Sequence, residues 1–248
     1  MAKGLSLVAG GAVFERSGPA ETPRAGSPIP RMGDFRSRPL GLGERWSTRG
    51  PSSPTLSELF AASPRDGGWA GFLLPQLDRS KPLLWVQDRM AILESGRIYP
   101  PGLGGDEILH VEARDARAAL WAMEEGLRCS ALSAVIGEMY GDPAALDFTA
   151  TRRLAVASER SGVPCWLVRL NGNATLSGAR MRWRIASAPS LIDPFDARAP
   201  GAPAWNAELF RARGFAPGRW SVAHEADRFH LVAGTGDRTL GEGDRLRA

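Results

Sequence analysis

The stretch ELFAASPRDGGWAG, residues 58–71, has the pattern of a strand that runs through a tight turn into a helix. Its beginning is apolar, its middle contains two adjacent glycines, and an apolar segment follows it. A phosphate-binding loop has this layout, but that loop ends in Gly-Lys followed by Ser or Thr. Here Trp69 and Ala70 follow Gly68, so the stretch is either an altered phosphate loop or an ordinary turn.

Short apolar segments continue downstream of this turn. They are rich in Val, Ile, Leu and Trp and are bounded by Pro, Gly or charged residues, as strands buried on both faces are. Such segments occupy residues 82–88, 107–113, 132–139 and 164–170. Because helical segments lie between them, the pattern predicts an α/β fold with a mostly parallel sheet flanked by helices.

Two of the helical segments have clear boundaries. In residues 115–129, Asp115 is a suitable N-cap, and Glu124 and Arg128 have the spacing of an i, i+4 ion pair. One apolar stripe of this helix consists of Ala119, Leu120, Met123 and Leu127. The other helix is expected over residues 147–162, which begin with an Asp and end with a capping Gly.

The last part of the chain has a different pattern. Residues 179–188 alternate apolar side chains with arginines, which predicts a strand with one exposed, polar face. Residues 191–203 are expected to form a loop. Residues 205–234 then predict two or three antiparallel strands, which would extend one edge of the parallel sheet.

Composition divides the chain into three parts. Residues 15–54 are rich in Pro, Gly, Ser and Arg and lack any sustained apolar period, and residues 1–54 are therefore predicted to form a poorly ordered arm. Residues 55–234 contain the predicted core, and residues 235–248 are expected to be a flexible tail. The net charge of +4 is carried almost entirely by arginine on the basic side, because Lys3 and Lys81 are the two lysines among 31 basic residues.

Cysteine and histidine usage points to a protein without a metal centre. Cys129 and Cys165 are single and distant in sequence, which predicts buried thiols in a reducing compartment and no disulfide framework. The three histidines lack the spacing of zinc ligands. No apolar run approaches the roughly 20 residues of a membrane span. We therefore expect a cytoplasmic protein that binds neither a metal nor a membrane.

Three segments, taken in order, carry a resemblance to a known family. They are HVEARDARAALWAMEEGLRCSALSAVIGE (110–138), ATRRLAVASERSGVPCWLVR (150–169) and WNAELFRARGFAPGRWSVAHE (205–225). With them the chain resembles the ImuA family, RecA-like proteins encoded in bacterial mutagenesis cassettes. Their genes lie beside those for an inactive Y-family polymerase, ImuB, and an error-prone replicative-type polymerase. The resemblance covers about residues 55–234 and implies a RecA-like core.

The RecA-like comparison implies a phosphate loop that has lost its functional side chains. With Gly68 as the last glycine of the loop, Ser63 stands at the position of the first glycine, Trp69 at that of the lysine and Ala70 at that of the hydroxyl. The lysine holds the β- and γ-phosphates and the hydroxyl binds Mg²⁺. We therefore expect no nucleotide cofactor, and we expect Trp69 to fill the vacated cavity.

The other catalytic positions that the resemblance implies are altered as well. Arg89 lies near the place of the water-activating glutamate, and Gly137 or Glu138 stands where the Mg²⁺-linked aspartate would be. The two DNA-gripping loops correspond to residues 140–147 and 171–178, which are short and leave little room for filament-type DNA binding. The sequence thus predicts no catalytic residue, no enzyme activity, and weak or indirect contact with DNA.

Aromatic and arginine side chains gather near the end of the predicted core. These residue types carry much of the binding energy at protein interfaces. The candidate partner surface consists of Trp205, Phe210, Arg211, Arg213, Phe215, Arg219 and Trp220. Packing of the aromatic residues in the core is the alternative interpretation.

The resemblance implies an adaptor without catalytic activity in SOS-induced error-prone translesion synthesis. Its expected partner is ImuB and, through ImuB, the error-prone polymerase, with RecA as a further candidate. Two alternatives remain open. One is a cell-division inhibitor like SulA, which also has a RecA-like core without a phosphate loop. The other is a degenerate DNA-stimulated ATPase that would use Glu138.

Overall fold

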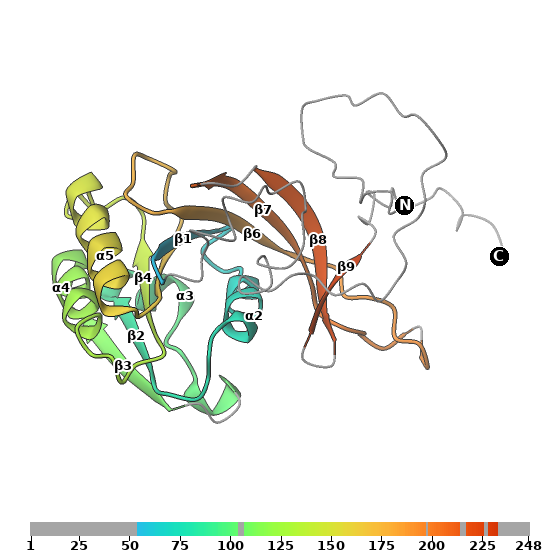
Figure 1. Cartoon of the computed structure of the whole chain (residues 1–248). Coiled ribbons are helices and arrows are strands. Elements are labelled where there is room, and N and C mark those ends of the chain that lie inside the picture. Colours follow the sequence, from blue (N-terminus) through green and yellow to red (C-terminus); the bar gives the residue numbers. More distant parts are fainter. Residues whose placement is uncertain (1–53, 104–106, 197, 214–216, 226–227, 233–248) are drawn as a thin grey trace, which may run out of the picture.

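A single mixed sheet runs through the computed structural model, which describes residues 54–103, 107–196, 198–213, 217–225 and 228–232 (Figure 1). The strands in this part of the chain are β1 Leu56–Ala61, β2 Leu83–Asp88, β3 Ile108–Ala113, β4 Ala134–Tyr140, β5 Cys165–Leu170, β6 Met181–Ala188, β7 Ala204–Ala212, β8 Gly218–Glu225 and β9 Arg228–Val232. Their order across the sheet is β3-β2-β4-β5-β1-β6-β7-β8-β9.

The sheet has a parallel part and an antiparallel part. Every neighbouring pair from β3 to β6 is parallel. The pairs β6–β7, β7–β8 and β8–β9 are antiparallel. The prediction of an α/β, RecA-like core with a mostly parallel sheet and an antiparallel C-terminal extension is therefore confirmed. Strand β1 lies inside the sheet, between β5 and β6, so the turn that follows it emerges at the centre of the molecule.

Helices cover both faces of the parallel part (Figure 1). They are α2 Gly68–Leu73, α3 Arg89–Ser95, α4 Ala116–Gly126 and α5 Phe148–Ser161, with two short 3₁₀ helices, η2 Leu74–Gln76 and η3 Pro100–Leu103. Side chains of α2 and α3 pack on one face in a cluster with Leu59 and Trp85. Side chains of α4 and α5 pack on the other face in a cluster with Val135 and Leu167. The central strands are apolar on both faces because both faces are covered.

The helix caps follow the predicted local chemistry. The Asp115 carboxylate accepts a hydrogen bond from the Ala118 N–H at 2.8 Å, and Asp147 caps α5 in the same way. Gly162 ends α5 with φ of 76°, a left-handed conformation that glycine adopts without a steric cost. The apolar stripe predicted for the first of these helices is buried in full.

The prediction of an ion pair between Glu124 and Arg128 is wrong. Glu124 binds Arg153 of α5, with 2.6 Å between its Oε2 and Arg153 Nη2. Arg128 pairs with Glu125, three residues earlier, at 3.0 Å. The reason is that α5 packs beside α4 and brings a guanidinium to the free side of Glu124, a contact that spacing within one helix cannot reveal.

Strand β6 corrects a second prediction. Met181, Trp183 and Ile185 point into the core as the alternation requires. Arg182 was expected on an exposed face, yet its side chain is 3% exposed. The parallel register places Glu58 of β1 directly opposite Arg182, and 2.6 Å separates the carboxylate from Arg182 Nε. A buried arginine is found here because its counter-charge comes from the neighbouring strand.

Aromatic rings enclose this buried ion pair. The Arg182 guanidinium lies over the rings of Phe60 and Phe210, at 5.3 and 5.2 Å from their centroids. The Ser177 hydroxyl donates to the other oxygen of Glu58 at 2.7 Å. Both carboxylate oxygens are thus hydrogen-bonded, which favours a buried charge pair. On the other side of the pair, the buried Arg182 Nη2 has no hydrogen-bond partner within the described residues.

The two cysteines lie in different environments. Cys165 is buried, and burial raises the pKa of its thiol well above the ordinary value, but Cys129 is exposed, contrary to the prediction. No helix in the described ranges is long and apolar enough to cross a membrane. The predicted arm, apart from Pro54, and the predicted tail lie outside the described residues, so these domain boundaries stay predictions.

We predict that Glu58→Gln lowers the free energy of unfolding by about 3–5 kcal/mol, because the Arg182 charge then lies buried without its partner. Replacing both residues, as Glu58→Leu with Arg182→Met, should cost less than the single change. Glu125→Gln, which removes an exposed ion pair, serves as the control and should cost less than about 1 kcal/mol. Urea unfolding followed by tryptophan fluorescence measures the stability of all three variants. A Glu58→Gln protein as stable as wild type would contradict the prediction.

Candidate functional site

The candidate site lies at the carboxyl ends of the parallel strands, where open α/β sheets bind their ligands. Three elements meet there: the turn between β1 and α2, the end of β2, and the end of β4. Strand β1 ends at Ala61 and α2 begins at Gly68, so the predicted strand–turn–helix path is confirmed. Within it, Ser63 is exposed, Ala70 is half-buried and Trp69 is buried.

The Asp66 side chain binds one backbone donor at the start of α2 and two donors of Ser187. Its carboxylate accepts hydrogen bonds from the Gly68 N–H at 2.9 Å, the Ser187 N–H at 2.9 Å and the Ser187 hydroxyl at 2.5 Å. Partial burial acts to raise the pKa of Asp66, but these hydrogen bonds outweigh it and hold the pKa below the ordinary value. The turn therefore contains a charged carboxylate, bound by the backbone, and that carboxylate links it to the end of β6.

Close packing explains the two glycines of α2. A Cβ at Gly68 would lie 2.1 Å from the Ser187 hydroxyl oxygen, and a Cβ at Gly71 would lie 2.7 Å from a ring carbon of Trp205. Strands β6 and β7 thus approach the helix so closely that no side chain fits. The glycines therefore permit close packing between the turn and the antiparallel extension.

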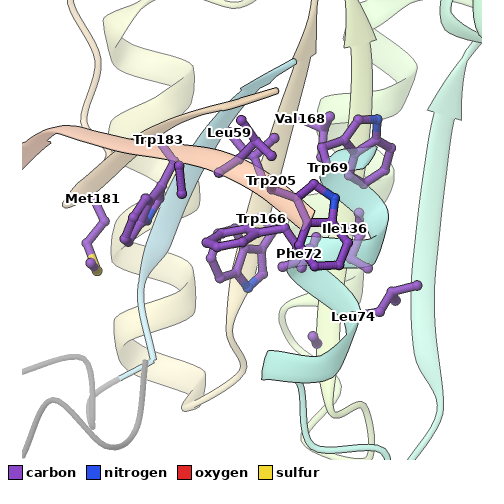
Figure 2. Close-up of a cluster of buried hydrophobic side chains, with 14 of the residues drawn as sticks. Leu59, Trp69, Phe72, Leu74, Ile136, Trp166, Val168, Met181, Trp183 and Trp205 are labelled. Carbon is purple, nitrogen blue, oxygen red and sulfur yellow. The ribbon is translucent and has the colours of Figure 1, made fainter. Parts of the chain in front are cut away.

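Trp69 packs against the sheet and does not face solvent. It is 6% exposed, and its ring centroid lies 5.7 Å from that of Trp85 on β2. Figure 2 shows Trp69, Phe72 and Trp205 gathered around α2 beside side chains of the sheet. The tryptophan at the lysine position is therefore a core residue.

A buried carboxyl group, Glu138, lies at the end of β4. It is 3% exposed and accepts hydrogen bonds from Trp85 Nε1–H and, at 3.1 Å, from Gln87 Nε2–H. Burial raises the pKa of Glu138 to about 7, although both hydrogen bonds act in the opposite direction. Gln87 connects this group outward, because its carbonyl oxygen lies 3.0 Å from His110 Nε2 and accepts from the Ile98 N–H.

The neighbouring residues Asp88 and Arg89 do not join Glu138 in a cluster. Asp88 caps α3, accepting from the Ala91 N–H at 2.6 Å and the Tyr140 N–H at 3.3 Å. Arg89, which stands near the place of the water-activating glutamate, is exposed. Across the described part of the chain, no three His, Cys, Asp or Glu side chains gather closely enough to hold a metal ion.

The two segments for which the resemblance implies a comparison with DNA-gripping loops, residues 140–147 and 171–178, are bound to each other. Asp142, after β4, accepts hydrogen bonds from Arg169 at 2.5 Å and from the N–H and side-chain amide of Asn173 at 2.9 and 2.7 Å. The Gly178 N–H donates to the Thr151 hydroxyl at 2.9 Å. These contacts fix both short segments against the body of the protein.

The structure divides the candidate partner surface between two faces of the sheet. Trp205 is 4% exposed and belongs to the core, which corrects its assignment to a surface, and Trp220 packs against the same cluster. Phe210 and Arg219 lie on the opposite face. The remaining residues are Arg211 and Arg213, which are exposed, and Phe215, which lies outside the described residues. A partner role for the exposed members stays a prediction.

Two further residues, Arg184 and Glu208, lie on the same face as Phe210 and were not predicted as part of the partner surface. The Arg184 guanidinium lies 4.1 Å from the Phe210 ring centroid. Glu208 bridges Arg184 at 3.1 Å and Arg219 at 2.9 Å, so three strands are joined in one row. The alternation of arginines in β6 was the available signal, but the partner of each arginine depends on strand register.

We predict that Glu138 makes stability depend on pH. Because its pKa of about 7 exceeds the ordinary 4.5, the folded protein holds the proton more tightly, and the free energy of unfolding falls as pH rises through this window. Glu138→Gln should remove up to about 3 kcal/mol of this decline between pH 4.5 and 8. Urea unfolding at several pH values measures it.

His110 also contributes to the pH dependence of stability. Burial lowers its pKa, so its own contribution is lost as pH falls, with the opposite sign, and it is present in both proteins. Burial also raises the pKa of Asp88, which contributes with the same sign as Glu138 in both proteins. The difference between wild type and Glu138→Gln therefore reports the Glu138 carboxyl group together with its charge interaction with Asp88. Equal pH slopes for the two proteins would contradict the prediction.

Comparison with known proteins relates the sequence of this chain to a family. No protein-family model matches the chain. Two curated relatives, both called Protein ImuA, come from Caulobacter vibrioides strains NA1000 / CB15N and ATCC 19089 / CIP 103742 / CB 15. Each is 32% identical over 179 residues, which cover 64% of this chain and 68% of the relative. At this identity and coverage, the chain belongs to the ImuA family.

Proposed function

We propose that this protein is an adaptor without catalytic activity in SOS-induced error-prone translesion synthesis, and that it binds the inactive Y-family polymerase ImuB. Membership of the ImuA family supports the pathway. The observation that carries the adaptor role is the Asp66 carboxylate, which takes up the Gly68 N–H and joins the former phosphate-loop turn to Ser187. The RecA-like framework is kept while the turn serves the fold.

Three features of the turn support the absence of nucleotide binding. A triphosphate needs a lysine for its β- and γ-phosphates and a hydroxyl for Mg²⁺. Trp69 and Ala70 supply neither, and Trp69 is committed to the core. A phosphate would also meet the negative charge of Asp66, whose pKa is lowered by its hydrogen bonds despite partial burial. Repulsion and missing ligands act in the same direction.

The surroundings of Glu138 speak against a degenerate ATPase. A carboxyl group holds Mg²⁺ when it is ionised and has free oxygen lone pairs. Here Trp85 and Gln87 already donate to the two oxygens, and a pKa of about 7 leaves much of the population neutral at physiological pH. Glu138 is better suited to hold β2 and β4 in register than to activate water.

Contacts with DNA are expected to be weak or indirect. The segments around Asp142 and Asn173 are short and are bound to each other and to Arg169, so they do not extend to enclose a strand. An adaptor of this kind reaches DNA through its polymerase partners. RecA is a further candidate partner. We expect the contacts with ImuB and with RecA to use surfaces outside the former nucleotide site.

We expect no binding of ATP with Mg²⁺ by isothermal titration calorimetry at up to about 1 mM nucleotide, a concentration that detects even weak sites. Asp66→Asn, which removes the repelling charge but restores no lysine, should bind equally little. An intact RecA protein is the positive control. Micromolar binding by the wild type would overturn the assignment of the turn.

We expect the purified full-length chain to bind ImuB from the same cassette with a Kd of about 1 μM or tighter. The binding should not change on addition of ATP. Bio-layer interferometry measures it, with the bacterial division tubulin homologue as the comparison partner. Binding to that homologue and none to ImuB would reject the adaptor and favour a division inhibitor like SulA.

A further inference from the structure

In the described part of the chain, no helix packs on one face of the antiparallel extension. Helices α4 and α5 cover the parallel strands on this side, and the buried cluster beneath them contains no side chain of β6, β7 or β8. Figure 1 shows both helices over the parallel part, while β6, β7 and β8 run on past them. The other face of these three strands belongs to the core around α2. The uncovered face is therefore where a partner could reach the extension.

Arginine side chains lie in a row on this face. Arg184 of β6 and Arg219 of β8 are 51% and 59% exposed, and Glu208 of β7 binds them both. Arg211 of β7 lies opposite Arg182 in the register, and residues opposite each other point to the same face. Within the described residues, Arg211 is exposed and forms no ion pair. We call this set of four residues, together with Phe210, the arginine face: Arg184, Glu208, Phe210, Arg211 and Arg219.

A bulge in β7 places the aromatic ring of Phe210 on the arginine face. The pairing register shifts between Arg182 and Trp183, which leaves Phe210 as an extra residue in β7. The Phe210 ring packs against that of Phe60, with 5.7 Å between the ring centroids. The Arg184 guanidinium lies over the Phe210 ring, 4.1 Å from its centroid. Phe210 therefore supports a planar cation whose other side is directed to solvent.

The arginine face has an excess of positive charge. Arg184, Arg211 and Arg219 carry three positive charges, and Glu208 carries one negative charge. The buried Arg182 charge beneath them is balanced by Glu58 and adds nothing to this excess. A surface of this kind attracts an anionic partner.

The contacts of Glu208 distinguish between two kinds of anionic partner. A carboxylate of an acidic peptide binds the N–H edge of a guanidinium. Glu208 already occupies the Nε and Nη2 edge of Arg219, at 3.0 and 2.9 Å, and Nη1 of Arg184, at 3.1 Å. The flat side of Arg184 stays exposed, and nucleobases stack on guanidinium planes. Arg211 forms no such ion pair and can bind a phosphate.

We propose that the arginine face binds single-stranded nucleic acid, with a base stacked on Arg184 and a phosphate held by Arg211. Unpaired bases are required, because a base inside a duplex is stacked on its neighbours and cannot lie on the guanidinium. The site is separate from the turn after β1, and it goes beyond the proposed adaptor role because it does not depend on ImuB. Three arginines make few phosphate contacts, so we expect weak binding.

The test measures fluorescence anisotropy of a labelled oligothymidylate of about 20 nucleotides with the full-length chain. We expect a Kd of about 10 μM at about 50 mM salt. Arg211→Gln should weaken binding at least about threefold and lower the slope of log Kd against log salt by about 0.7, the value for one phosphate contact. Arg117→Gln is the matched control, because Arg117 is also exposed and forms no ion pair within the described residues but lies on α4. It should change the Kd less than about twofold.

Arg184→Lys separates stacking from charge. The substitution keeps the positive charge and removes the planar group, so binding should weaken about fivefold or more while the salt slope stays unchanged. A duplex of the same length should bind more weakly than the single strand at each salt concentration. Urea unfolding of Arg211→Gln checks the fold, and its midpoint should equal that of wild type because the side chain is exposed.

Three results would overturn the inference. The first is no binding of the single strand at about 100 μM protein, the weak end of non-specific affinities. The second is equal affinity of wild type, Arg184→Lys and Arg211→Gln, which would place the strand elsewhere on the chain. The third is binding of polyglutamate as tight as that of the oligonucleotide and unaffected by Arg184→Lys, which would assign the face to an acidic protein. None of them bears on ImuB binding, so the proposed function would stand.

Discussion

Two carboxylates hold the boundary between β1 and β6, on which the rest of the structure depends. Glu58 binds Arg182 within the sheet, and Asp66 binds Ser187 at its carboxyl edge. The boundary matters because β6 is the strand that joins the parallel part to the antiparallel extension. Within the sheet, strands β7 to β9 are attached to the parallel part through β6. Packing of Trp205 against α2 adds a second contact between the two parts.

The same boundary leaves the turn after β1 bound within the chain. In a phosphate loop the N–H groups at the start of the helix face a ligand. Here one of them donates to Asp66, and that carboxylate also binds the backbone and hydroxyl of Ser187. The turn thus contains an anion that belongs to the chain.

Local patterns in the sequence were sufficient for much of the fold. The strands, the two capped helices and the buried stripe of α4 follow from spacing over a few residues, where hydrogen bonds and side-chain contacts are close in the chain. The strand–turn–helix path around Gly67 and Gly68 also follows from local order. These features depend on residue type and short-range order alone.

The interactions that could not be predicted join residues far apart in sequence. Arg182 was expected in solvent because nothing near it reveals Glu58, which lies 124 residues away and reaches it through strand register. Trp205 was expected in a partner surface, but the close approach of α2 through Gly71 places it in the core. The Asp66–Ser187 contact, 121 residues apart, was missed for the same reason.

The contact between Asp66 and Ser187 links the boundary to the proposed adaptor role. Ser187 lies next to Ala188, the last residue of β6, and the segment that leads to β7 follows it. In a nucleotide-driven protein, a contact at this turn would change with the ligand and move what is attached to it. Asp66 is part of the chain, so this contact needs no ligand. A contact of this kind suits the proposed adaptor, which would bind its partner without a nucleotide cycle to control it.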